Sequence, residues 1–296
     1  MAIPTIPDIR ELMEAGMHFG HASGHWHPKM KPYIFATRDK LSIIDLEQTR
    51  TKLTEVLTIL EERIRDGKSI ILVGTKDQVK DRVKEMGLKL GMPYVNVRWL
   101  GGTMTNFGEI QKSIARMKRM EEALENGDAA KMIKKERVMM ENELRRLHYK
   151  LGGLRDMTKK PDALFIIDPG HEHNAVKEAR HEGIEIFGIV DTNTNPDDVD
   201  HLIPANDDGP KSLKMLLDFV EQTIESGQKL ISLKRDAVAA PPKEEEVVIE
   251  IPLEEVIVGE TDEEKAKLTE AKKKQASPSV KSIEEKARHT TKDIEE

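Results

Sequence analysis

Residues 69–75, Ser-Ile-Ile-Leu-Val-Gly-Thr, contain the segment that decides the fold. A continuous apolar run followed by glycine and threonine is typical of a strand that is buried on both faces of a parallel sheet. Similar strands are expected at 94–97, 163–167 and 186–190, and helical patterns separate them. Strands that alternate with helices predict an α/β fold in three layers, a flavodoxin- or Rossmann-like parallel sheet with helices on both faces.

Four long helices are expected to cover this sheet. The first follows Asp45, carries apolar residues along one face and ends at Asp66-Gly67. A short helix, Ile9–Ala15, should precede it, with Asp8 or Thr5 as its cap. The four long helices are predicted at 46–65, 77–90, 174–182 and 211–226.

Residues 108–151 are an insertion that the α/β pattern does not need. Apolar residues recur there at spacings of four and three, on both sides of a turn marked by Asn126-Gly127-Asp128. We therefore expect an antiparallel coiled-coil helical hairpin, inserted into an α/β domain made of 1–107 and 152–236. The expected seam consists of Ile110, Ile114, Met117, Leu124, Ile133, Met140, Leu144, Leu147 and Leu151.

The last segment, 237–296, differs in composition from the rest of the chain. It contains 16 acidic and 10 basic residues, so it carries most of the net charge of −7. Its few apolar residues cannot offset the entropy of ordering, which predicts an acidic, disordered tail. Within it, Val247–Ile251 is expected to add an edge strand when it meets a partner.

Composition excludes several classes of protein. The chain has no cysteine, which rules out disulfides, thiolate zinc sites and cysteine nucleophiles. The N-terminal residues do not resemble a secretory signal, and no apolar run approaches the ~20 residues that span a bilayer. We expect a cytoplasmic protein without a membrane partner.

The turns after the predicted strands lack phosphate-binding motifs. Gly74-Thr75-Lys76 contains neither G-x-G-x-x-G nor a P-loop. The segment 98–103, Arg-Trp-Leu-Gly-Gly-Thr, also lacks that spacing, although Arg98 and Trp99 offer a charge and a stacking surface. Packing of the indole in the core is the alternative for Trp99. We expect no nucleotide cofactor, no small-molecule substrate and no enzymatic activity.

Histidines and aspartates offer two weak candidates for a metal site. The histidines between 18 and 27, with His171 and His173 as partners, match no standard zinc pattern, and structural roles are favoured. Aspartates after the predicted strands could hold hydrated Mg²⁺ at the carboxyl end of the sheet, although helix caps and loop contacts are favoured. No metal is predicted, and structural Mg²⁺ or Zn²⁺ stays an alternative with the candidate ligands His21, His25, His27, Asp191, Asp207 and Asp208.

Residues 18–45 carry the side chains that suit nucleic acid best. Histidines, Trp26 and lysines surround Pro28 and Pro32. Because proline fixes its own φ and restricts the preceding residue, we expect a rigid, extended, basic loop that presents phosphate and base contacts. Tyr33–Phe35 and Leu41–Ile44 then predict a β-hairpin with a loop, 36–40, longer than the tightest type.

This stretch resembles the opening signature of the bacterial small-subunit ribosomal protein S2 family. The resemblance covers about residues 9–225 and not the tail. Gly24, His25 and His27 depart from the family pattern, which has basic groups before the tryptophan and asparagine before the proline, and this weakens the basic loop. Further motifs in the family's order are 70–76 (IILVGTK), 94–96 (YVN), 98–103 (RWLGGT), 105–107 (TNF), 151–153 (LGG), 161–165 (PDALF), 191–193 (DTN) and 203–208 (IPANDD).

The resemblance implies a structural constituent of the small ribosomal subunit that takes part in translation. Its implied partners are ribosomal RNA and neighbouring small-subunit proteins, including the mRNA-binding protein S1. The alternatives are an enzyme that uses the aspartates at the carboxyl end of the sheet, and a scaffold whose acidic tail recruits proteins without RNA. The cations of the hairpin could also merely solvate it. The residues expected to contact RNA are Lys29, Lys31, Lys76, Arg98, Thr103, Asn106, Lys112, Arg116, Lys118, Arg119, Lys134 and Lys135.

Overall fold

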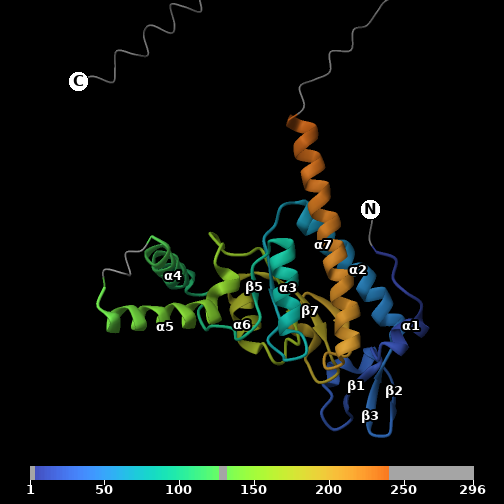
Figure 1. The fold of residues 1–296 in the computed structure, drawn as a ribbon. Helices are drawn as coiled ribbons and strands as arrows, with labels where there is room; N and C mark the ends of the chain where they lie inside the picture. Colours follow the sequence, from blue (N-terminus) through green and yellow to red (C-terminus); the bar gives the residue numbers. More distant parts are fainter. Residues whose placement is uncertain (1–3, 127–131, 240–296) are drawn as a thin grey trace, which may run out of the picture. The chain divides into compact units, whose positions relative to one another are not determined.

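The computed structural model describes residues 4–126 and 132–239, so the predicted tail beyond Ala239 and most of the predicted turn at Asn126-Gly127-Asp128 lie outside the described residues. A parallel sheet lies at the centre, in the order β5-β4-β6-β7-β8 (Figure 1). Numbered along the chain, these strands run 2-1-3-4-5, the order of flavodoxin-like sheets, and the order reverses between β4 and β6. The strands are β4 (Ile70–Val73), β5 (Tyr94–Val95), β6 (Ala163–Ile167), β7 (Glu185–Val190) and β8 (His201–Pro204).

Helices cover both faces of the sheet, so the predicted α/β fold is confirmed. One apolar core joins α1, α2, α3 and α7 to one face, and a second joins α6 and the start of α4 to the other. Asp8 caps α1 and Asp45 caps α2 through their carboxylates. The helices are α1 (Ile9–Glu14), α2 (Leu46–Arg65), α3 (Lys80–Leu90), α4 (Phe107–Glu125), α5 (Lys134–Leu151), α6 (His173–Glu182) and α7 (Pro210–Ala239).

The last helix is longer than the sequence pattern indicates. We expected it to end at Ser226, but α7 continues to Ala239 and includes three residues assigned to the tail. Gly227 lies against α2, where a Cβ atom would come within 2.8 Å of Ile64 Cγ2. Its lack of a side chain allows the two helices to pack closely, so this glycine does not end the helix.

A second, three-stranded antiparallel sheet precedes α2, in the order β1 (Phe19–Ala22), β3 (Leu41–Ile44), β2 (Ile34–Arg38). Strand β1 was not predicted. The expected long hairpin loop is wrong, because Arg38 pairs with Leu41 across a two-residue turn. Asp39 and Lys40 both have positive φ, 50° and 61°, the conformation that the tightest hairpin turns require.

The predicted extended loop at 27–32 is also wrong. Pro28–Tyr33 forms a 3-10 helix, η1, whose first position is proline. His27 Nδ1 accepts a hydrogen bond from Lys29 N at 3.3 Å and caps this helix. Proline at the first helical position is favourable because its missing N–H would have no partner there.

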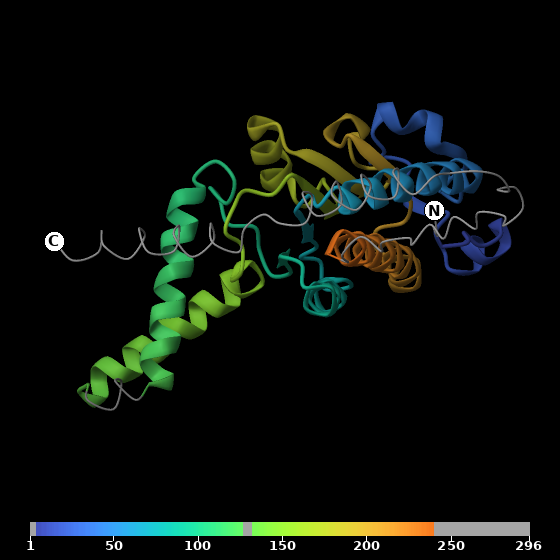
Figure 2. The ribbon, with the colours of Figure 1, turned by 90° about the horizontal axis from the view of Figure 1, so that it is seen from above.

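Helices α4 and α5 form an arm: α4 leads away from the sheet and α5 returns (Figure 2). Ile110, Ile114 and Met117 on α4 and Leu144 on α5 are buried, and Ile110 and Ile114 belong to the core that also includes α6. Ile133 is 70% exposed, so its expected place in the seam is wrong. Within 4–126 and 132–239, no helix is both long and apolar enough to cross a membrane.

Candidate nucleic-acid interface

The loop between β5 and α4 is held by a single carboxylate from α6. Glu178 Oε1 accepts hydrogen bonds from Trp99 Nε1 at 3.1 Å and from the Gly102 amide at 2.8 Å. Its Oε2 accepts from the Met104 amide at 2.9 Å and the Thr105 amide at 3.3 Å. Burial raises the pKa of Glu178, but the hydrogen bonds outweigh it, so the net pKa lies below its ordinary value. The carboxylate therefore fixes the shape of this loop.

Trp99 and Thr103 face the interior of the loop rather than solvent. Trp99 is 5% exposed, which supports the packing alternative. Thr103 is buried, and its hydroxyl donates to Leu100 O at 2.6 Å. Arg98 and Asn106, by contrast, are exposed at the two ends of the loop. Thr103 thus has almost no exposed surface, and its hydroxyl contacts the loop's own backbone.

Arg98 lies in a pocket that the sequence did not reveal. The loop forms one wall, the end of α5 a second, and α6 a third. Its lining includes three cationic side chains, and Tyr149 on its rim is 68% exposed. None of the three cations forms an ion pair within the described part of the chain. We call this the Arg98 pocket, and its distinctive members are Arg98, Tyr149, Lys150, Asn174 and Lys177.

The six arm cations differ in their surroundings. Lys112 pairs with Glu109 at 2.6 Å, Arg116 with Glu143 at 2.7 Å and Lys118 with Asp156 at 3.4 Å. These acids are themselves on the surface, and such pairs contribute about 0–1 kcal/mol, so they can exchange for phosphate. The other three, Arg119, Lys134 and Lys135, are exposed and form no ion pair with any described residue.

The antiparallel sheet and the segment 23–33 between β1 and β2 present exposed aromatic and cationic side chains. Phe35 is 76% exposed and Trp26 36% exposed. Lys31 is exposed, whereas Lys29 forms an ion pair with Asp197. Arg38 and Lys40 are exposed as well, so the stretch offers both stacking surfaces and positive charge.

Lys76 lies among carboxylates at the carboxyl end of the parallel sheet. Its Nζ is 2.7 Å from Asp168, 3.0 Å from Asp207 and 2.8 Å from Asp208. This is the switch point between β4 and β6, where such folds place ligands. The lysine is engaged by these three carboxylates and is only 15% exposed.

His21 joins the same cluster from β1. Its Nδ1 is 3.1 Å from Asp191 Oδ2 and its Nε2 is 3.3 Å from Asp208 Oδ2. Contact with Asp191 raises the pKa of His21 to about 9. Burial, with Asp168 and Asp191 nearby, raises the pKa of Asp207 to about 7. Of the six candidate ligands, the structure brings His21 and the three aspartates together, while His25 and His27 lie outside the cluster.

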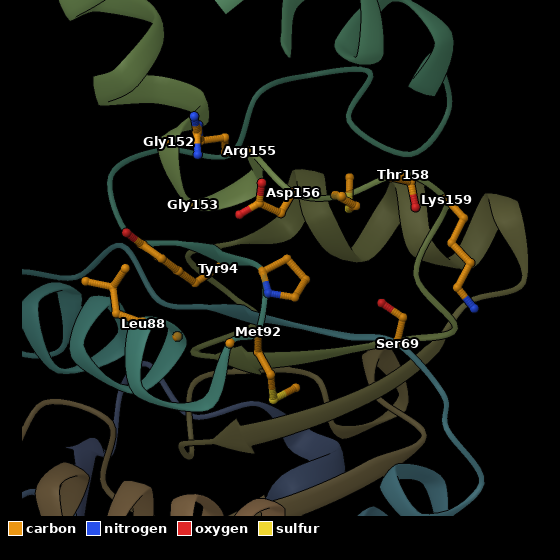
Figure 3. A pocket seen from close by; sticks show the side chains of 14 residues that line it. Ser69, Leu88, Met92, Tyr94, Gly152, Gly153, Arg155, Asp156, Thr158 and Lys159 are labelled. Carbon is orange, nitrogen blue, oxygen red and sulfur yellow. The ribbon is translucent and has the colours of Figure 1, made fainter. Parts of the chain in front are cut away.

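A pocket of about 380 Å³ lies elsewhere, between the end of α3 and the segment that follows α5 (Figure 3). Ser69, Tyr94 and Lys159 are among its lining residues. It adjoins the amino ends of β4, β5 and β6, the end opposite to the ligand position of α/β sheets. The ionisable cluster does not line it, so its geometry does not indicate a catalytic centre.

The fold and these surfaces together define an α/β protein with a projecting cationic arm and no P-loop or dinucleotide-binding motif. A family model for ribosomal protein S2 matches residues 12–227. The chain belongs to the ribosomal protein S2 family. This membership confirms the resemblance seen in the sequence and implies a structural protein of the small ribosomal subunit.

Proposed function

We propose that the chain binds ribosomal RNA as a structural constituent of the small ribosomal subunit in the cytoplasm, and has no enzymatic activity. The observation that carries this proposal is the Arg98 pocket. Three cations, Arg98, Lys150 and Lys177, converge there without an ion pair in the described ranges, beside an exposed tyrosine. Unpaired cations contribute little to folding, whereas they suit phosphate, and a tyrosine ring suits a stacked base.

The arm extends this surface. We propose that α4 and α5 pack as a coiled coil through the buried residues of the seam and carry Lys112, Arg116, Lys118, Arg119, Lys134 and Lys135 to RNA phosphates. Their exposure and weak ion pairing support this role. For Lys76 and Thr103 we propose a positioning role in place of direct RNA contact, because both side chains are largely buried and hold neighbouring groups.

The antiparallel sheet is proposed to complete the contact. Lys31, Phe35 and Trp26 would bind splayed nucleotides, and Lys29 would do so after release from Asp197. Neighbouring small-subunit proteins, including protein S1, are proposed to bind the remaining exposed apolar side chains, such as Met13 and Leu88. An enzyme is the rival, but Lys76 already pairs with Asp207 and Asp208, two of the aspartates that it would use.

The test compares three triple variants, each of which removes three positive charges. The first changes Arg98, Lys150 and Lys177 to Gln. The second changes Arg119, Lys134 and Lys135 to Gln. The control changes cations that are also exposed and unpaired among described residues but lie on the helices of the other face: Arg50→Gln, Lys84→Gln and Lys214→Gln.

The measurement is the affinity for small-subunit ribosomal RNA across a salt series. Each lost phosphate contact should lower the log–log slope by about 0.7–0.9, so each test variant should lose about 2–3 units. The control should keep the original slope. Equal slopes for all four proteins would overturn the proposed RNA surface and favour a solvated or protein-binding role for the arm.

A further inference from the structure

We propose that His21, Asp191 and Asp207 bind one divalent metal ion of the zinc class, which fastens the antiparallel sheet to the carboxyl end of the parallel sheet. One atom from each of the three residues, a ring nitrogen and two carboxylate oxygens, lies within 4.8 Å of the others. The residues come from β1, from the end of β7 and from the loop after β8. A shared ion would therefore join three segments that are distant in the chain.

The backbone is shaped to bring His21 to this position. Its amide donates to Thr192 Oγ1 at 2.9 Å. At Gly20, a Cβ atom would lie 2.6 Å from Thr192 Cγ2 and 3.0 Å from Ser42 O, so any other residue would push β1 away. This close approach places the imidazole against the carboxyl end of the sheet.

Two buried polar atoms of the cluster lack a hydrogen bond. Asp207 is fully buried and its Oδ1 contacts Lys76, but its Oδ2 has no partner among the described residues. His21 Nδ1 lies 3.1 Å from Asp191 Oδ2 without the geometry of a hydrogen bond. A buried carboxylate oxygen without a partner costs free energy. An ion held between these atoms would remove that cost.

The cluster also carries an excess of negative charge that a cation would neutralise. Asp168, Asp191, Asp207 and Asp208 face a single lysine, Lys76. The carboxylates of the cluster therefore outnumber its cationic side chains. Asp168, Asp191 and Asp207 are almost completely buried, so this excess is poorly solvated. A divalent ion would neutralise most of it.

The ligand types select the class of metal. One imidazole and two carboxylates suit zinc, which accepts nitrogen and oxygen and often keeps a fourth position for water. Magnesium prefers oxygen ligands alone. Asp208 adds a second argument, because its Oδ2 lies 3.3 Å from His21 Nε2. A carboxylate at that nitrogen holds the proton there and leaves the Nδ1 lone pair for the metal.

The experiment uses the full chain, depleted of metal with a chelator and then titrated with zinc chloride by calorimetry, with bound metal counted by elemental analysis. We expect one equivalent of zinc per chain and a higher Tm when zinc is bound. His21→Gln and Asp207→Asn should abolish this binding. Asp208→Asn should weaken it about 10- to 100-fold. His25→Gln is the control, since this nearby histidine is exposed and lies outside the cluster.

Three results would overturn the proposal. The first is a wild-type chain that holds no zinc after equilibration, which decides the matter even if the variants fail to fold. The second is zinc binding that survives in His21→Gln or Asp207→Asn. Millimolar magnesium serves as the competitor: retention of zinc in its presence supports the zinc class, and displacement contradicts it.

Discussion

Replacement of Glu178 by glutamine should loosen the loop that shapes the Arg98 pocket. The carboxylate accepts five hydrogen bonds, from Trp99 Nε1, from the amides of Gly102, Met104 and Thr105, and from the Thr105 hydroxyl. Glutamine keeps one acceptor oxygen and turns an N–H₂ group toward donors on the other side. A hydrogen bond to a charged group contributes about 1.5–3 kcal/mol, and Glu178 is only partly buried. We therefore expect a loss of about 2–4 kcal/mol, or about 4–16 °C in Tm.

The assay is urea unfolding followed by fluorescence of Trp99. The chain has two tryptophans, so a Trp26→Phe background leaves Trp99 as the reporter beside the changed group. Glu182→Gln on the same helix is the matched control. It removes the surface contacts of Glu182 with Lys160 and His181 and should change stability much less than Glu178→Gln.

The pH dependence supplies an independent check. The folded-state pKa of Glu178 lies below its ordinary value of 4.5, so its stabilisation is fully present above that value. It is lost as pH falls through the lowered pKa of the folded state. The difference between wild type and Glu178→Gln should be constant near neutral pH and shrink in acid. A Glu178→Gln protein as stable as the Glu182→Gln control at pH 7 would refute the reasoning.

Three further predictions concern the scaffold and the absence of catalysis. Asp39→Asn with Lys40→Gly should stabilise the chain by about 1 kcal/mol in urea unfolding, because both positions have positive φ; destabilisation would contradict the turn geometry. Gly153→Ala should destabilise the chain by about 1–3 kcal/mol or more, because its Cβ would lie 2.1 Å from Tyr94 O. Gly152→Ala meets nothing closer than 4.0 Å and should be nearly neutral, so equal losses of stability in the two variants would contradict this argument. Calorimetry should detect no micromolar binding of ATP, NAD or FMN, because the strand–helix turns lack a phosphate-binding loop.

The sequence predicted the central strands well and the peripheral ones poorly. Ile70–Val73 and Ala163–Ile167 are buried at every position, so a continuous apolar run is a sufficient signal. β8 contains His201 and Pro204 and was not predicted. Its histidine stacks on Phe187, and proline is tolerated in an edge strand. Such partners exist only after the sheet has formed.

In the candidate site, too, the contacts that depend on tertiary structure could not be predicted from the sequence. Lys76 follows a strand and was expected to meet phosphate, but three carboxylates from the ends of β6 and β8 engage it first. Lys150 and Lys177 stand on surface-like positions of separate helices, and only the tertiary fold brings them to Arg98. The local sequence indicated Arg98 as a candidate contact. Its cationic neighbours, Lys150 and Lys177, could be identified only from the structure.

The most direct test of the proposed function is sedimentation of the full chain with small ribosomal subunits from which this protein has been removed, at low magnesium and moderate salt. We predict that the wild-type chain sediments with the subunit and that the variant with Arg98, Lys150 and Lys177 changed to Gln shifts to the free fraction as salt rises, while the Arg50, Lys84 and Lys214 control does not. A wild-type chain that stays in the free fraction, or a pocket variant that sediments like wild type at every salt concentration, would contradict RNA binding at this surface.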